Sequence, residues 1–222
     1  MSFPFLLAIH SYGGANAALC RHWPYFERAG AIRIVGIGTE KHDCLFPEGV
    51  ESVEIGDGLY MNGPNLCIRL METISWFLTQ PQNYLVCAEY DLLFLKPVKP
   101  FTGICADRTG GKTWGSIGSF YSHCPWLIDR DSAYPLVNEM VRILAEGHCQ
   151  YGTPESSPDV FFGYACERAG LAVNHDHFRL FTRNCFDVGN DLQLAREAFL
   201  CGEYDALHGC KTQREFEFIT AP

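Results

Sequence analysis

The chain has 222 residues, of which 47% are hydrophobic and 14% aromatic, and its formal net charge is −9. This composition is typical of a well-packed globular protein and excludes a disordered one, and the acidic balance argues against a broad nucleic-acid surface. No apolar run approaches the roughly 18 residues needed to span a bilayer. Residues 1–9 have neither a basic start nor a small-residue cleavage site. We expect one domain over residues 1–222, with no membrane partner.

Eleven cysteines are scattered along the chain, and none forms a Cys-x-x-Cys pair. Their positions inside apolar segments, as at Cys87 and Cys166, favour small buried side chains in a reducing compartment. A cytoplasmic location is therefore expected. A zinc site built from Cys201, Cys210 and His208 is an alternative, although the spacing fits no standard zinc finger.

The first half of the chain alternates predicted strands and helices. In chain order, we expect a strand over 3–10, a helix over 15–29, strands over 31–38 and 50–55, a helix over 62–79 and a strand over 84–88. Asn62 is a suitable N-cap for the second helix, with Pro64 in its first turn. The inner face of this helix is predicted to carry Leu66, Leu70, Ile74, Phe77 and Leu78.

The second half is less regular. We expect strands over 101–106 and 116–121 and helices over 131–144, 157–169 and 192–200. Asp131 or Ser132 is predicted to cap the first of these helices, whose apolar stripe comprises Ala133, Leu136, Val137, Met140, Val141 and Leu144. The alternation along the whole chain predicts an α/β fold, with a mixed, mostly parallel central sheet flanked by helices. Ligands of such sheets bind beyond the carboxyl ends of the strands.

An acidic tripeptide, Glu89-Tyr90-Asp91, follows the apolar strand that begins at Tyr84. Two carboxylates spaced two residues apart on extended backbone project to the same side, and leaving them unpaired beside apolar runs would be costly. A divalent cation is the expected compensation, because hard oxygen ligands suit Mg²⁺ or Mn²⁺. Such a cation typically carries substrate phosphates.

This tripeptide resembles the Asp-x-Asp metal-binding motif of GT-A-fold glycosyltransferases, which is often followed by an apolar run and a proline, as in Leu92 to Pro97. Two later segments carry the resemblance further. The helix start Ser157-Pro158-Asp159 is similar to the acidic helix start of inverting GT-A enzymes, although Pro158 replaces the usual first acidic residue. The segment His208-Gly209-Cys210-Lys211 resembles the late His, Gly and Lys with which one retaining class contacts the metal and the diphosphate.

The resemblance implies a single GT-A-like, Rossmann-related domain that uses Mn²⁺ or Mg²⁺ and a nucleotide-diphosphate sugar. The implied metal ligands are Asp91, Glu89 and His208. The implied donor-binding residues are His10, Ser11, Tyr12, Asn65, Arg69, Glu89 and Lys211. Asp159 matches the general base that takes the proton of the acceptor hydroxyl in inverting enzymes.

Several alternatives remain open. A retaining transferase would use Asp159 only to position the acceptor, and a degenerate GT-A domain would bind glycans or partners without catalysis. A sugar-phosphate nucleotidyltransferase lacks support, because no early Gly-rich Arg/Lys signature is present. Asp159 could also serve only as a helix-start charge.

The acceptor is open among a glycan, a protein hydroxyl and a modified nucleic-acid base of the kind that phage enzymes modify. A loop containing Arg108, Lys112 and Trp114 is a candidate contact for a phosphate-bearing acceptor. The same loop could equally be a solvated basic turn.

Overall fold

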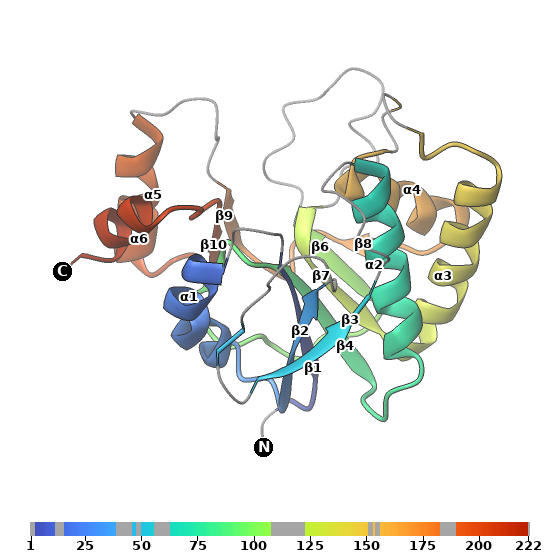
Figure 1. Ribbon diagram of the computed structural model, residues 1–222, viewed down its shortest axis with the longest axis horizontal. Helices are drawn as coiled ribbons and strands as arrows, with labels where there is room; N and C mark the ends of the chain where they lie inside the picture. The colour runs from blue at the N-terminus through green and yellow to red at the C-terminus, as the bar shows by residue number, and fades with distance from the viewer. Residues whose placement is uncertain are drawn as a thin grey trace.

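A mixed, mostly parallel sheet of seven strands occupies the centre of the molecule (Figure 1). In spatial order its strands are β3 (Glu51–Glu54), β2 (Arg33–Gly38), β1 (Leu6–His10), β4 (Tyr84–Glu89), β7 (His123–Asp129), β6 (Ile104–Asp107) and β8 (Val173–Asn174). β7 runs antiparallel to both of its neighbours, whereas the other pairings in this sheet are parallel. The predicted α/β class and the mixed, mostly parallel sheet are confirmed.

The structure is a computed structural model that describes residues 3–11, 16–38, 46–47, 50–55, 63–107, 123–150, 153, 156–182 and 190–221. Within these residues a second, three-stranded sheet consists of β5 (Leu92–Phe94), β10 (Ala206–His208) and β9 (Leu180–Thr182). The central strand β10 is antiparallel to β5 and parallel to β9. Since β5 begins three residues after β4 ends, the short turn between them links the two sheets at the acidic tripeptide.

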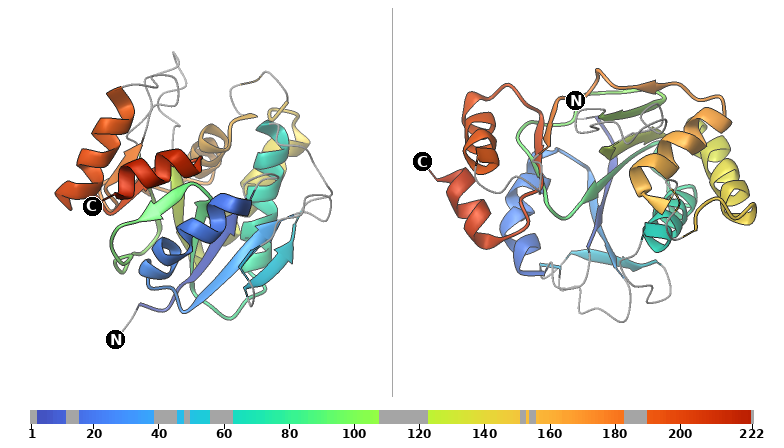
Figure 2. Two further views of the ribbon diagram at one scale, coloured as in Figure 1. Left: turned by 60° about the vertical axis from the view of Figure 1, so that its left-hand side comes forward. Right: turned by 90° about the horizontal axis from the view of Figure 1, so that it is seen from above.

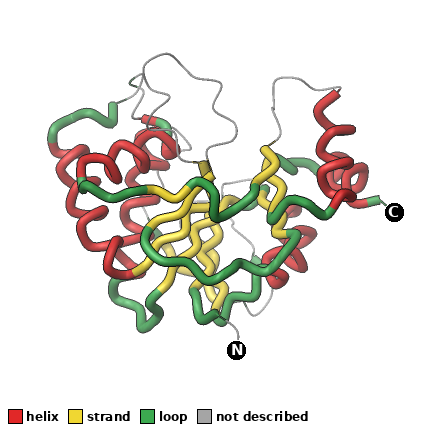
Figure 3. The backbone as a smooth tube through the Cα atoms, turned by 180° about the vertical axis from the view of Figure 1, so that it is seen from behind, coloured by secondary structure: helices red, strands yellow, loops and turns green. Residues whose placement is uncertain are grey.

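Helices cover both faces of the large sheet, as the view from above in Figure 2 shows. One side carries α2 (Gly63–Phe77), α3 (Arg130–Ala145) and α4 (Pro158–Arg168). The other side carries α1 (Asn16–Arg28), α5 (Asn190–Cys201) and α6 (Gln213–Thr220). The tube in Figure 3 shows the same layers from behind, with the strands between the two groups of helices.

The central strand β1 is buried along its whole length because helices cover both faces of the sheet. It pairs in parallel with β2 and β4, and the register sets His10 opposite both Ile37 and Glu89. The carboxyl ends of β1 and β4 therefore lie side by side. This pairing brings His10 and Ser11 next to the acidic tripeptide, at the edge where ligands of parallel sheets bind.

Helix α3 begins one residue earlier than its predicted cap. Asp129 is the N-cap, with extended backbone and a side chain that accepts a hydrogen bond from the Ser132 amide at 2.9 Å. The predicted cap at Asp131 or Ser132 was wrong, because the helix follows directly from β7. Val141, predicted to be in the apolar stripe, is 49% exposed, and Ile143 is buried in its place.

Several elements were not predicted. They are β5, β7, β8, β9, β10 and α6, and the shortest of them have two or three residues. The strand expected over 116–121, the basic loop of residues 108–114 and the N-cap Asn62 lie outside the described residues. In the described part of the chain, no helix has both the length and the apolar character that a membrane span requires.

Candidate metal and substrate site

The acidic tripeptide forms a tight connection between the two sheets. Glu89 is the last residue of β4, and the amide of Tyr90 donates a hydrogen bond of 3.0 Å to the His10 carbonyl. Asp91 follows in the turn and is only 1% exposed. A carboxylate buried to this degree requires nearby positive charge.

The positive charge comes from His208, the last residue of β10, and from Lys211 shortly after it. The Nε2 atom of His208 lies 3.2 Å from Oε2 of Glu89, to which it donates a hydrogen bond, and 3.1 Å from Oδ1 of Asp91. The Nζ atom of Lys211 lies 3.8 Å from Oδ2 of Asp91. Strand pairing explains the approach, because His208 is opposite Leu92, the residue after Asp91. Four residues of the two predicted motifs thus meet at one point.

The four side chains perturb one another's ionisation. Burial alone would raise the pKa of Asp91, but the positive charges of His208 and Lys211 outweigh it and hold this pKa at about 2. Burial alone would lower the pKa of His208, yet the negative charges of Asp91 and Glu89 raise it well above its ordinary value. The protonated ring of His208 therefore lies between the two carboxylates.

A cysteine that sequence reasoning missed completes this group. Ligand atoms of Glu89, Cys124 and His208 all lie within 4.8 Å of one another. Burial raises the pKa of the Cys124 thiol well above its ordinary value, and the charges of Glu89, Asp91 and Asp159 raise it further. No spacing rule connects Cys124 to the acidic tripeptide, because the contact depends on β7 pairing with β4.

The zinc site considered from Cys201, Cys210 and His208 does not form in the part of the chain described here. Cys201 is exposed, and its thiol donates to the carbonyl of Ala198. Cys210 is buried in an apolar cluster around Ile219, although its amide donates a hydrogen bond of 3.2 Å to the Asp91 carbonyl. Of the three residues, only His208 belongs to the group that could hold a metal ion.

The carboxyl end of β1 lies beside this group. His10 and Ser11 are buried, and Nη1 of Arg69, a buried side chain of α2, donates a hydrogen bond of 2.9 Å to the Ser11 carbonyl. Burial, together with the nearby charge of Arg69, lowers the pKa of His10 to about 3, so that His10 is neutral. Arg69 thus fixes the start of the loop after β1. Tyr12, expected to contact the nucleotide base, lies outside the described residues.

His22 of α1 supports the tripeptide from the other side and was not predicted. Its Nδ1 atom donates a hydrogen bond of 2.7 Å to the Tyr90 carbonyl, and its ring lies 5.2 Å, between centroids, from that of Phe216. Burial lowers the pKa of His22 below its ordinary value, although the bond to Tyr90 and the charge of Asp91 oppose this. The neutral ring with a proton on Nδ1 satisfies these contacts.

The remaining predicted residues lie around the group at different depths. Asp159 is in the first turn of α4, partly exposed, and near enough for its charge to affect Cys124. Ser157 is the N-cap of this helix but makes no side-chain capping bond. Asn65 is partly buried in the first turn of α2, and the side chain of Lys211 is half exposed.

The group formed by Glu89, Asp91, Cys124 and His208 suits a divalent cation. Its donors are two carboxylates, an imidazole and a thiol, all of which bind cations of this class. Oδ1 of the buried Asp91 faces His208 and Oδ2 faces Lys211, so both carboxylate oxygens are directed toward positive charge. Chemically, the arrangement could hold a cation at the carboxyl edge of the sheet, with Lys211 adding positive charge beside it.

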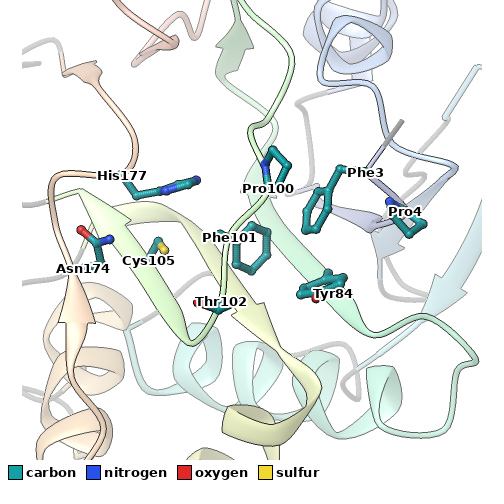
Figure 4. Close-up of a pocket in the computed structure, with 9 residues that line it drawn as sticks. All are labelled: Phe3, Pro4, Tyr84, Pro100, Phe101, Thr102, Cys105, Asn174 and His177. Atoms are coloured by element: carbon teal, nitrogen blue, oxygen red, sulfur yellow. The ribbon is translucent and has the colours of Figure 1, made fainter. Parts of the chain in front are cut away.

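A separate hollow of about 570 Å³ lies at the opposite, amino edge of the sheet. Figure 4 shows the rings of Phe3, Tyr84 and Phe101 grouped on one side of it, with His177 and Asn174 on the other. Phe3 and Tyr84 have ring centroids only 4.5 Å apart, so these rings mainly pack against each other. None of the predicted site residues lines this hollow.

Comparison with known proteins adds no assignment, because neither a protein-family model nor a curated protein matches the chain.

Proposed function

We propose that the protein is a metal-dependent glycosyltransferase of GT-A type, which moves a sugar from a nucleotide-diphosphate donor to an acceptor hydroxyl. The observation that carries the proposal is the meeting of Glu89, Asp91, His208 and Lys211 at one point beyond a parallel sheet. These residues come from the two segments that resemble the family's metal and diphosphate motifs. The resemblance and the three-dimensional arrangement thus point to the same chemistry.

In this proposal, Asp91, Glu89 and His208 hold Mn²⁺ or Mg²⁺, and the cation supplies charge stabilisation for the departing nucleotide diphosphate. The half-exposed ammonium of Lys211 is directed to Asp91 in the free protein and would bind a diphosphate oxygen in the complex. His10, Ser11, Asn65 and Arg69 would line the donor side.

Asp159 would act as the general base toward the acceptor hydroxyl, which implies inversion at the sugar carbon. Support comes from its partly exposed position at the first turn of α4 and from its electrostatic contact with Cys124 in the metal group. If the product keeps the anomeric configuration of the donor, Asp159 has a positioning role and the enzyme is retaining.

Donor binding tests the proposal. A thermal-shift screen of nucleotide-diphosphate sugars with Mn²⁺ should find a donor that stabilises the protein only when the cation is present. Calorimetry should then show that Asp91→Asn folds but loses Mn²⁺-dependent donor binding. Asp176→Asn is the matched control, because this exposed aspartate belongs to the segment after β8. Equal donor affinity in Asp91→Asn and the wild-type protein would contradict the proposal.

A non-catalytic GT-A-like domain would pass the binding test but show no turnover. Product analysis with candidate glycan, protein and nucleic-acid acceptors separates this case from an enzyme. A protein that binds the donor but neither transfers nor hydrolyses the sugar would favour the binding domain.

A further inference from the structure

We propose that Cys124 is a direct ligand of the cation held by Glu89 and His208, and that this thiolate makes the site selective for Zn²⁺-like cations over Mg²⁺. The inference rests on the proposed function and narrows it, since it concerns the cation of the same site and removes Mg²⁺ from the two cations named there. It nevertheless has its own test, which requires neither a donor nor turnover.

The placement of Cys124 follows from strand pairing. β7 is antiparallel to β4, and the paired residues run from Tyr84 opposite Asp129 to Cys87 opposite Trp126. Glu89 and Cys124 lie just beyond this last pair, each two residues from it in its own strand and at the same end of the two strands. Two of the ligands therefore belong to adjacent strands of a buried sheet, and their spacing does not depend on a loop.

The separations are close to those that a tetrahedral site requires. Metal–ligand bonds of about 2.0–2.3 Å, as found for zinc, place neighbouring ligand atoms roughly 3.3–3.8 Å apart. The ligand atoms of Glu89, Cys124 and His208 already lie within 4.8 Å of one another, and Nε2 of His208 is 3.2 Å from Oε2 of Glu89. Small side-chain rotations would bring the three donors onto one cation, with Asp91 beside them as a fourth.

The kind of cation follows from the donor atoms. Mg²⁺ requires nearly octahedral oxygen coordination, which a set containing sulfur and nitrogen does not provide. Thiolate together with imidazole favours Zn²⁺ and similar transition-metal ions. The charge of the cation would also offset the repulsion between a thiolate and the carboxylates of Glu89 and Asp91.

Cys124 could instead be only a small buried side chain, like Cys87 and Cys166. The two cases differ in whether sulfur bonds to the metal, and Co²⁺ reports this bond directly. Cobalt bound to a thiolate has a near-ultraviolet charge-transfer absorption, and a tetrahedral site has strong visible bands. We expect both when Co²⁺ is added to the protein in a Cys201→Ser background, which removes an exposed thiol.

The variants then locate the sulfur. Cys124→Ser should abolish the charge-transfer band and weaken Co²⁺ binding by at least about tenfold, because even outer-shell changes cost this much. Cys166→Ser is the matched control, since this thiol is also buried but lies in α4. Zn²⁺ should displace Co²⁺, whereas a large excess of Mg²⁺ should not.

A charge-transfer band that persists in Cys124→Ser, or displacement of Co²⁺ by Mg²⁺ as readily as by Zn²⁺, would overturn the inference. If Cys124→Ser does not fold, cadmium NMR of the protein with Cys124 intact decides the question. A cadmium resonance shifted into the range of sulfur coordination supports a thiolate ligand, and one in the range of oxygen and nitrogen coordination contradicts it. A cobalt–sulfur band without any donor binding would remove the proposed transferase activity and leave the metal site standing.

Discussion

At the scale of single residues, the backbone of Tyr90 determines how the two carboxylates point. Its amide donates to His10 at 3.0 Å and its carbonyl accepts from His22 at 2.7 Å. Both partners are buried, so water cannot readily replace them. The turn that carries Glu89 and Asp91 is thus fixed before any ligand binds, which lowers the cost of assembling a site.

His22 therefore has a testable positioning role. Replacing it with Leu, which fills similar space but cannot donate to Tyr90, should weaken Mn²⁺ or Zn²⁺ binding by about 10–100-fold. His22→Gln retains an N–H donor and should recover part of the affinity. Calorimetric titration of the two variants measures the difference. If His22→Leu folds and binds metal as the wild-type protein does, the turn does not depend on this bond.

Asp159 is the residue on which turnover should depend. If it removes the acceptor proton, Asp159→Asn should reduce turnover by roughly 10²–10⁴-fold and leave donor affinity nearly unchanged. Glu167→Gln is a suitable control, because it removes an exposed carboxylate from the same helix. Steady-state rates and donor titrations of both variants separate catalysis from binding. Unchanged turnover in Asp159→Asn would reduce its role to that of a helix-start charge.

The residues of the site differed in how visible they were in the sequence. The meeting of Glu89, Asp91 and His208 could be anticipated, because their two segments resemble motifs that lie together in GT-A enzymes. Cys124 and His22 could not, since a buried thiol and a helical His have the same pattern as ordinary core residues. They lie close to the tripeptide because of how the strands and helices pack, and the spacing of residues along the sequence does not reveal that packing.

At the scale of elements, the apolar stripe predicted for α3 differs in part from the face that the helix buries. Its sequence stripe includes both Val137 and Val141, but the helix turns so that Met140 and Ile143 are fully buried and Val141 is exposed. The helical repeat explains the difference, because the buried positions Ala133, Leu136, Met140 and Ile143 recur every three or four residues and Val141 lies outside that series.

This orientation predicts unequal costs for neighbouring substitutions. Ile143→Ala should lower the free energy of unfolding by about 2–5 kcal/mol, because it leaves a cavity in the core. Val141→Ala, on the exposed face, should change it by no more than about 0.5 kcal/mol. Chemical denaturation measures both values. Similar losses in the two variants would show that the helix face is incorrectly placed.

Strand β7 shows why part of the topology could not be predicted. Pro125 lies within it and cannot donate a ladder hydrogen bond, which argues against a central strand when only the sequence is read. The sheet accommodates it with a register irregularity between β6 and β7, where Cys105 is opposite Leu127 but Asp107 is opposite His123. The order and type of the elements from β1 to β4 were predicted correctly, because no proline lies inside their strands.

At the scale of the whole molecule, the site lies where the two sheets join. One apolar cluster fills the space between the large sheet and α2, α3 and α4. A second cluster packs the other face of the large sheet against α1 and the small sheet, and a third packs the small sheet against α5 and α6. The charged group forms at the carboxyl edge between these apolar layers. Its burial strengthens the interactions among Glu89, Asp91 and His208, and it also makes the stability of the fold dependent on pH.

That dependence should appear on the acid side. Burial and the charge of Arg69 lower the pKa of His10 from 6.5 to about 3 on folding, and the pKa of His22 is also lowered. Between pH 6.5 and 3 the unfolded chain binds a proton at His10 that the folded chain does not bind. The free energy of unfolding should therefore fall as the pH falls through this window, and His10 alone contributes a loss of about 2 kcal/mol by pH 5. His208 acts in the opposite sense near neutral pH, because its raised pKa keeps it protonated in the folded chain while the unfolded chain gains that proton only as the pH falls through 6.5. Its stabilising contribution grows as the pH falls toward that value and is constant well below it, so the loss from His10 dominates at the acid end of the window. Asp91 adds its own loss of stability only below about pH 3.8, its pKa in the unfolded chain.

Urea denaturation from pH 7.5 to 4.5 measures how the free energy of unfolding depends on pH. His10→Asn should make this slope shallower even if the variant is less stable at neutral pH. A slope identical to that of the wild-type protein would show that His10 is protonated in the folded state.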